Sequence, residues 1–224
     1  MNNLKSYQMQ LLDLVSFALF GGEKPDAPLT SEVLKEANQQ AVLTLLGVTK
    51  ETAPDFYLMH AMNATRLLHY EGCKAFEIAK KLKQDGKIRH LGMSFHDSAE
   101  VLDQILTKHP EIEVVQIQFN YVDFEDEKVQ SRKCYEVCCK HGKPVLIMEP
   151  VKGGSLINLP EAAQKVLDRL ERGSNASYAI RFAASFEGVI MVLSGMSTID
   201  QMEDNVSFMK EFKPLNTDEK DALE

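Results

Sequence analysis

The sequence predicts an α/β fold built on a parallel β-sheet. From about residue 55 onward, short apolar runs alternate five times with amphipathic segments, a rhythm typical of parallel strands joined by crossover helices. The apolar runs are mostly continuous, as expected for strands that are buried on both faces. Polar residues gather where these runs end, and the sites of parallel α/β folds lie at the carboxyl ends of their strands.

Each predicted strand is a short apolar run. The strands are expected at Asp55–His60, Ile88–Ser94, Val114–Asn120, Pro144–Met148 and Val189–Leu193. Amphipathic segments with capping and terminating residues predict the helices that follow. These helices are expected at Cys73–Gln84, from the N-cap Ser98 to Lys108, and at Glu127–Lys140, 159–171, 175–186 and Ile199–Phe212.

The first fifty residues do not share this rhythm. Apolar residues at helical spacing predict one amphipathic helix over residues 4–20 and another over 31–46. These predicted helices contain no recognisable catalytic or binding motif. The sequence therefore predicts two parts, a helical segment over residues 1–50 that is unrelated to the sheet and an α/β part over residues 51–224.

The composition is that of an ordinary globular protein. With 224 residues, 44% of them hydrophobic and 26% charged, the chain can bury a sizeable core, which excludes a disulfide-stapled miniprotein and wholesale disorder. The formal net charge of −8 excludes a general attraction to nucleic acid. No apolar run approaches the ~18 residues of a membrane span. We therefore expect a cytoplasmic protein without nucleic-acid or membrane partners.

Five strings of residues, one around each predicted strand, resemble the aldo-keto reductase family in order and with natural spacing. The strings are Asp55–His60, Gly86–Ser94, Val115–Tyr121, Ile147–Gly154 and Leu193–Asn205. The resemblance covers roughly residues 43–222 and favours the bacterial branch whose members often carry a C-terminal ferredoxin-like segment. It implies a (β/α)8 barrel of the TIM type. Because about five βα units are recognisable, the resemblance implies a partial barrel that is incomplete at its N-terminal side.

The resemblance implies NAD(P)H-dependent reduction of an aldehyde or ketone, with a small carbonyl compound as substrate. Hydride would come from the nicotinamide, and an acid of the enzyme would protonate the oxygen. NADP(H) is the expected cofactor, and NAD(H) is the alternative because the predicted phosphate loop has no Lys or Arg for a 2′-phosphate. No iron–sulfur cluster is expected, because the sequence ends at Glu224 without the required run of cysteines.

Of the family's four catalytic residues only His60 has a counterpart. A ring nitrogen at a strand end can orient or polarise a substrate carbonyl, and the alternative is a buried histidine with a structural role. The family's Asp, Tyr and Lys are not identifiable, and Tyr7 and Lys5 lack the expected strand context. An inactive, truncated reductase that only binds a dinucleotide, or serves as an interaction fragment, is therefore the alternative function.

The resemblance also implies cofactor-binding positions. Ser94 and Gln116 would bind the nicotinamide carboxamide, although Phe95 and Met148 depart from the Asn and stacking Tyr of many relatives. A glycine-containing loop that opens a helix can bind phosphate, and the alternative is a simple helix cap at Ser197 or Thr198. The full predicted set is Ser94, Gln116, Met148, Pro150, Lys152, Gly153, Gly195, Met196, Ser197, Gln201, Asp204 and Asn205.

Three other features have structural interpretations. Cys134, Cys138 and His141 suggest a metal site, but buried thiols on a core helix explain them better, and no metal is expected. The acidic run 123–127 predicts a solvated loop. A partial barrel has two open strand edges, which invite pairing. The alternatives are that the N-terminal helices cover one edge or that two copies associate as a homodimer through the open edges.

Overall fold

The structure is a computed structural model that describes residues 53–170 and 173–223. The helices predicted for 4–20 and 31–46 lie outside the described residues, and the domain boundary near residue 50 stays a prediction. Residues 53–57 and Thr65–Leu91 form one compact unit, and Leu58–Ala64 with 92–223 form a second.

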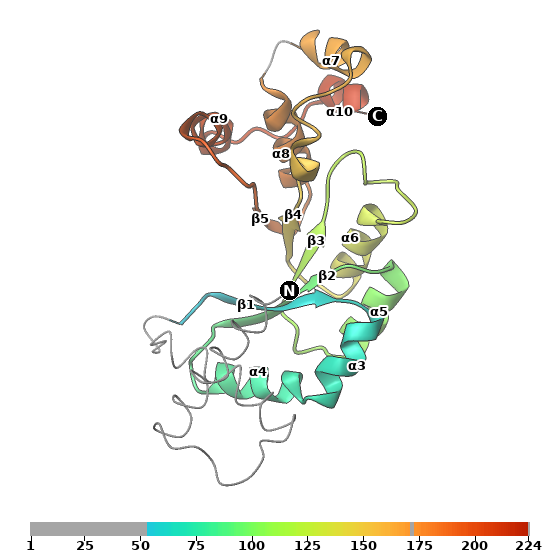
Figure 1. Cartoon of the computed structure of the whole chain (residues 1–224), viewed down its shortest axis with the longest axis vertical. Coiled ribbons are helices and arrows are strands. Elements are labelled where there is room, and N and C mark those ends of the chain that lie inside the picture. The colour runs from blue at the N-terminus through green and yellow to red at the C-terminus, as the bar shows by residue number, and fades with distance from the viewer. Residues whose placement is uncertain (1–52, 171–172, 224) are drawn as a thin grey trace, which may run out of the picture. The chain divides into compact units, whose positions relative to one another are not determined.

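Five parallel strands form one sheet, in which the spatial order equals the order along the chain (Figure 1). This order arises when every crossover places the next strand beside the last one, as in the wall of a barrel. The predicted α/β fold and its likeness to a partial TIM-type barrel are therefore confirmed. The strands are β1 (Phe56–Met62), β2 (His90–Phe95), β3 (Val114–Gln118), β4 (Val145–Met148) and β5 (Val189–Val192).

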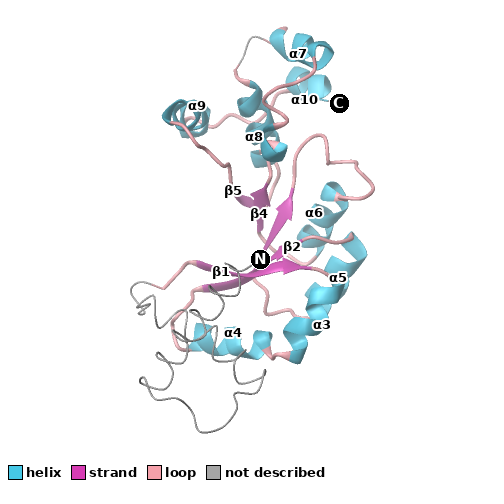
Figure 2. Cartoon of the chain, viewed as in Figure 1, coloured by secondary structure: helices cyan, strands magenta, loops and turns pink. Residues whose placement is uncertain are grey.

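Helices occupy the connections between the strands (Figure 2). None of the helices in the described part of the chain is long and apolar enough to span a membrane. The helices of the described part of the chain are α3 (Ala64–Gly72), α4 (Ala75–Gln84), α5 (Ala99–Lys108), α6 (Ser131–Lys140), the short 3₁₀ helix η1 (Lys152–Gly154), α7 (Glu161–Asp168), α8 (Asn175–Ala184), α9 (Ile199–Lys210) and α10 (Thr217–Leu223).

Three helices depart from the sequence prediction: α3 and α10 were not predicted, and α6 begins later than predicted. The departures of α6 and α3 have identifiable reasons. Helix α6 begins at Ser131 instead of Glu127, because the Asp126 carboxylate accepts the N–H groups of Lys128 and Val129 and holds a turn there. Such local hydrogen bonds compete with a helix. The N-terminus of α3, which was not predicted, is capped by Asp97 from 33 residues away, so its start has no local signal.

In the first unit, α4 buries its apolar face against the chain on either side of it. Leu82 and Ile88 form a buried cluster, and Tyr57 and Ile78 pack against them. A backbone hydrogen bond also fixes the start of β2, where the N–H of His90 donates to the Asp55 carbonyl at 2.8 Å. The apolar residues of α4 therefore recur at helical spacing because together they form the face of the helix that is buried.

In the second unit, Gly92 lets β2 lie very close to its neighbours. A Cβ atom at this position would lie 2.5 Å from Cγ1 of Val114 and 2.6 Å from Cδ2 of Leu58. It would also lie 2.7 Å from the Val114 carbonyl oxygen, which belongs to the rigid backbone of β3. Only glycine fits such a close approach, and it fixes β2, with Ser94 at its end, against β3.

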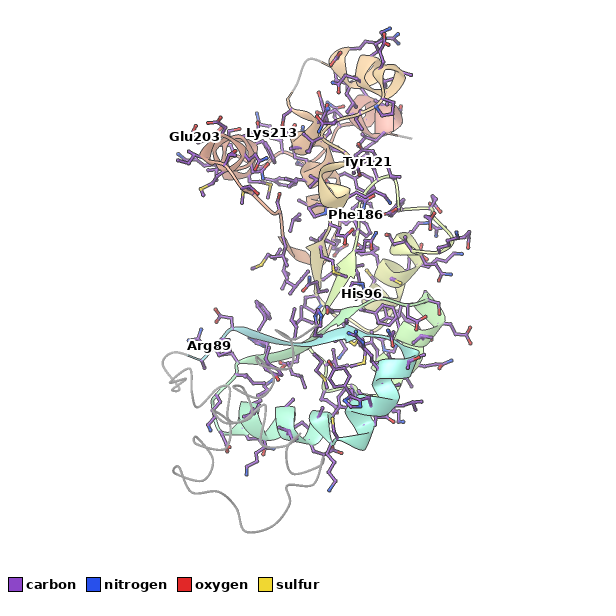
Figure 3. All side chains as sticks on the ribbon, viewed as in Figure 1. Arg89, His96, Tyr121, Phe186, Glu203 and Lys213 are labelled. Carbon is purple, nitrogen blue, oxygen red and sulfur yellow. The ribbon has the colours of Figure 1, made fainter. Side chains whose placement is uncertain are left out.

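Six aromatic rings connect the loop after β3 to helices α6 and α8. Their centroids lie between 4.9 and 6.1 Å apart, mostly edge to face, the geometry that aromatic pairs prefer. Figure 3 labels Tyr121 and Phe186 of this cluster. The rings are Phe119, Tyr121, Phe124, Tyr135, Phe182 and Phe186.

A buried ion pair joins α10 to α8. The Arg181 guanidinium donates to both carboxylate oxygens of Glu219, at 2.9 and 3.0 Å, and the two side chains are only 10% and 2% exposed. Arg181 also donates to the Lys213 carbonyl, and the Asn216 N–H donates to Glu219. The pair therefore holds the chain after α9 against α8, which carries one wall of the site described below.

We predict that Glu219→Gln strongly destabilises the protein, because it leaves the Arg181 cation buried without a counter-charge. The free energy of unfolding in urea should fall by about 3–5 kcal/mol. The matched control is Glu161→Gln, which removes the exposed pair with Lys165 and should cost only about 0.3–0.5 kcal/mol. Equal, small losses in both variants would contradict a structural role for the buried pair.

Candidate functional site

A cleft of about 1140 Å³ opens at the carboxyl ends of β4 and β5. Four stretches of chain line it: the turn after β4, helix α7, the start of α8, and the loop after β5 with the first turns of α9. Parallel strands deliver their following loops to the same edge of the sheet. The stretches lie within 149–157, 164–168, 173–178 and 193–205.

The loop after β5 is fixed to α9 by a capping box. The Thr198 hydroxyl accepts from the Gln201 N–H at 3.3 Å. The Gln201 side-chain oxygen in return accepts from the N–H groups of Ser197 and Thr198, at 2.7 and 3.2 Å. A Thr followed three residues later by Gln is a local signature of this motif. One turn further, Asn205 donates to the Ser194 hydroxyl at 3.1 Å, so the loop cannot swing away from the helix.

The N-terminus of α8 opens onto the same cleft. The Ser174 hydroxyl accepts from the Ser177 N–H at 3.1 Å and donates to Oδ2 of Asp204 in α9 at 2.6 Å. This bond ties the two helix starts together. Each helix N-terminus carries a partial positive charge, so the cleft contains two helix ends of the kind that bind anions.

The turn after β4 forms the remaining wall. Glu149, Lys152, Gly153 and Gly154 all have positive φ, between 49° and 91°, a left-handed conformation that non-glycine residues seldom adopt. The side chain of Asn120 donates to the Glu149 carbonyl at 3.1 Å and so holds the bend against the loop after β3.

Asp123 is the centre of a buried polar cluster that supports this wall. Its carboxylate, 2% exposed, accepts from the side-chain amides of Gln118 and Asn120, both at 2.7 Å, and is ion-paired with Lys152. Of the run 123–127, expected to be a solvated loop, Asp123 is therefore an exception. The carboxylate can be buried because three donors near the ends of β3 and β4 satisfy its hydrogen-bonding capacity.

Burial raises the pKa of the Asp123 carboxyl, but the hydrogen bonds from Lys152, Asn120 and Gln118 outweigh this effect and lower the pKa below its usual value. The carboxylate is thus charged near neutral pH, and it neutralises the Lys152 ammonium beside it.

A model of the aldo/keto reductase family matches residues 25–224. The chain belongs to the aldo/keto reductase family. This match begins inside the segment that the sequence analysis set apart, and the boundary near residue 50 stays a prediction. A search of curated proteins found no match.

Solved aldo-keto reductases share the fold at low sequence identity. One from Bacillus halodurans in its holo form has a TM-score of 0.65 at 22% identity, covering 88% of this chain and 68% of that one. A thermostable enzyme in complex with the inhibitor epalrestat has a TM-score of 0.62 at 17% identity, covering 100% and 88%. One from Klebsiella pneumoniae in complex with NADPH has a TM-score of 0.58 at 17% identity, covering 86% and 74%.

The fold brings most of the predicted cofactor positions of this family member together. Eight of the twelve line the cleft, and they come from both sides of it. They are Pro150, Gly153, Gly195, Met196, Ser197, Gln201, Asp204 and Asn205.

The other predicted positions do not line the cleft. Ser94 is buried and accepts the Ala61 N–H at 2.7 Å, and Gln116 lies opposite it in β3. Met148 ends β4, and Lys152 is bound to Asp123 as described above. His60 is an exposed residue of β1, at an edge of the described sheet.

The structure also places residues in the cleft that sequence reasoning missed. Ser174, Asn175 and Tyr178 line it from the start of α8, and Asp200 lines it from α9. The signal for Ser174 was present, because Ser is a preferred N-cap and stands directly before the predicted helix 175–186.

The cysteine-rich helix α6 lies apart from the cleft lining. Cys134 and Cys138 are buried, and burial raises the pKa of the Cys134 thiol to about 12. The His141 ring lies 2.5 Å from Oδ1 of Asp103.

We predict that Asp123 makes stability depend on pH in the acid range. Because its folded pKa is lower than the unfolded value of about 3.9, its contribution is complete above that value and is lost as the pH falls through the folded pKa. Asp123→Asn should remove this part of the acid dependence and lower the free energy of unfolding at neutral pH by about 1–3 kcal/mol. Urea unfolding between pH 3 and pH 7 measures both effects.

The exposed residue Asp218, in the first turn of α10, provides the control. Asp218→Asn should leave the pH profile close to that of the natural sequence. A profile of Asp123→Asn that runs parallel to the natural one would show that the carboxylate gains nothing from its three donors.

Proposed function

We propose that the cleft binds a nicotinamide dinucleotide, and that the protein is an oxidoreductase acting on a small aldehyde or ketone. One observation carries the proposal: the N-termini of α8 and α9 and the left-handed turn after β4 share one cleft. Helix N-termini and left-handed turns are the two backbone features that bind phosphate groups. The NADPH in the Klebsiella pneumoniae structure gives the same indication for this fold.

The lining fits such a ligand in size and polarity. The cleft volume of about 1140 Å³ lies slightly above the range of ordinary ligand pockets, about 300–1,000 Å³, as suits a ligand of dinucleotide size. Leu193 and Met196 offer exposed apolar surface for rings, and Ser197 and Asn205 offer a hydroxyl and an amide group for sugar or phosphate oxygens.

The residues of this chain would bind and orient, while the bound nicotinamide would supply or accept the hydride. We propose NADP(H) or NAD(H) as the cofactor. We further propose that His60 orients the substrate carbonyl, in keeping with its place in the family's motif.

A second candidate is a protein that binds the dinucleotide without turnover. It is favoured by the position of His60 on β1, outside the cleft lining. The two candidates share the cleft and differ only in whether a carbonyl compound is reduced there.

Association of two copies is a separate proposal. The edge strand β5 exposes Ile190 and Met191, at 52% and 44%, and an open apolar edge favours pairing with another chain. We propose a homodimer formed through the open sheet edges of a cytoplasmic protein. Light scattering after size-exclusion chromatography tests it, and a monomer at all concentrations would exclude it.

We predict that NADH or NADPH raises the midpoint of thermal unfolding in a saturable way. A ligand that binds only the folded chain stabilises it by about 2.7 kcal/mol at a hundredfold excess over Kd. Gly195→Glu should abolish this rise, because it adds a negatively charged side chain to the cleft wall. A Cβ at Gly195 meets nothing within 4 Å, so the midpoint without ligand should not change.

The control is Gly72→Glu, where a Cβ also meets nothing within 4 Å and which lies outside the cleft lining. It should keep the full response to ligand. A midpoint that neither cofactor moves would refute the proposed function. If the cofactor shifts the midpoint, but its absorbance does not fall when a panel of aldehydes and ketones is added, the second candidate, binding without turnover, is the one supported.

A further inference from the structure

The exposed apolar surface of the described chain is concentrated in its C-terminal part. Nine of the thirteen large hydrophobic side chains that are exposed among the described residues lie between Ile190 and Phe212. Single exposed hydrophobic residues are ordinary on protein surfaces, but a contiguous group marks a contact surface. Helix α9 lies within this stretch, beside α8 and at the end of an extended loop from β5 (Figure 1).

Helix α9 has one face turned to its own unit and another turned to solvent. None of its residues, all of which are described, is buried, and the half-buried ones are Asp204, Asn205 and Phe208. Asp204 and Asn205 bond Ser174 and Ser194 as described above, so this face looks toward α8 and the loop after β5. The other face carries four apolar residues, the α9 stripe, which are between 38% and 72% exposed: Ile199, Met202, Val206 and Met209.

The four residues of the α9 stripe follow one another at intervals of three, four and three positions. Because an α-helix turns by about 100° per residue, their side chains lie within a stripe roughly 80° wide. A helix that packs onto a globular core has a broader apolar face, whereas a narrow stripe at this spacing is the seam of a two-helix coiled coil. The spacing therefore points to another helix as the partner.

The α9 stripe is complementary to a second copy of itself. If two such helices pair antiparallel about a two-fold axis near residue 204, Ile199 lies opposite Met209 of the second copy. In the next layer, Met202 lies opposite its Val206. Each layer then combines one stiff β-branched side chain with one flexible thioether, which adapts to fill gaps. A two-fold axis makes each of these contacts occur twice, as in most homodimers.

The area of the α9 stripe suits a reversible dimer. Its four side chains expose on the order of 400 Å². Two copies would bury roughly 1,000 Å² in total once the flanking polar side chains are included, and interfaces at this low end of the specific range belong to transient complexes. The area therefore favours a dissociation constant in the micromolar range over a permanent dimer.

The charge of α9 favours a protein partner over a lipid surface. The helix contains Asp200, Glu203 and Asp204 against a single lysine, Lys210. Helices that lie on anionic membranes instead carry Lys and Arg on their polar face. Anionic headgroups would therefore repel α9.

We propose that the α9 stripe is the contact surface for a second copy of this chain, which pairs with it antiparallel in a weak homodimer. This surface is separate from the open strand edges, and its use does not depend on the binding of a dinucleotide. The cleft-lining residues Asp204 and Asn205 lie on the other face of α9, so the pairing leaves them in place.

The test measures the association of the full chain by sedimentation velocity over a range of concentrations. Val206→Lys places a charge in an inner layer of the stripe in both copies, and it preserves the helix because lysine is a good helix former. We expect the natural chain to show a monomer–dimer equilibrium and Val206→Lys to raise its dissociation constant about tenfold or more. Far-UV circular dichroism and the unfolding midpoint verify that the variant is folded.

Ile190→Lys is the matched control. It replaces a β-branched residue with the same exposed fraction as Val206, 52%, but on the edge strand β5. We expect it to keep the natural dissociation constant. A dimer lost in Ile190→Lys alone would overturn the inference and support pairing of the strand edges. Equal weakening by both variants would remove the specific role of α9.

Other occupants of the α9 stripe give distinct results. A natural chain that is monomeric at every concentration would overturn the inference. If Val206→Lys then lowers the unfolding midpoint and Ile190→Lys does not, a segment of the same chain covers the stripe. If the monomer instead binds vesicles of anionic lipid, a membrane covers it. Cofactor binding is measured separately, so none of these results bears on the proposed function.

Discussion

The parallel pairing of β3, β4 and β5 is the constraint on which the rest of the site depends. In β3 and β4, Gln118 lies opposite Met148, so both strands end at the same level and their loops must meet. Asn120 can therefore hold the Glu149 carbonyl at 3.1 Å, and Asp123 can reach Lys152. The polar cluster then keeps the left-handed turn after β4 in place, and that turn is one wall of the cleft.

The other walls are made by groups that first satisfy the chain itself. Ser174 and Thr198 cap α8 and α9, and Gln201 covers the N–H groups of the loop before α9. These bonds fix the cleft walls within the chain itself, and preorganisation of this kind reduces the entropy that a ligand would lose on binding. A phosphate placed on the same N–H groups would have to replace the Gln201 oxygen. In the proposed function, phosphate binding and helix capping would therefore compete for one set of donors.

One ion pair determines much of the charge of the cleft wall after β4. Lys152, which the sequence analysis placed among the cofactor-binding residues, has its positive charge balanced by Asp123. This arrangement leaves the described lining with carboxylates, amides and hydroxyls. The aromatic cluster that carries Tyr121 packs the loop around Asp123 onto α8, so the position of this acid is determined by packing as much as by charge.

The sequence by itself determined the order of the strands and of most helices, the caps at Ser98 and Thr198, and the motifs that place the chain in its family. These features depend on neighbours within a few residues, so periodicity and spacing reveal them. The tertiary structure decided the rest. The Asp123–Lys152 pair joins residues 29 positions apart, and the Ser174–Asp204 bond joins residues 30 apart. Local pattern contains no information on such pairings, because the sheet alone brings the loops together.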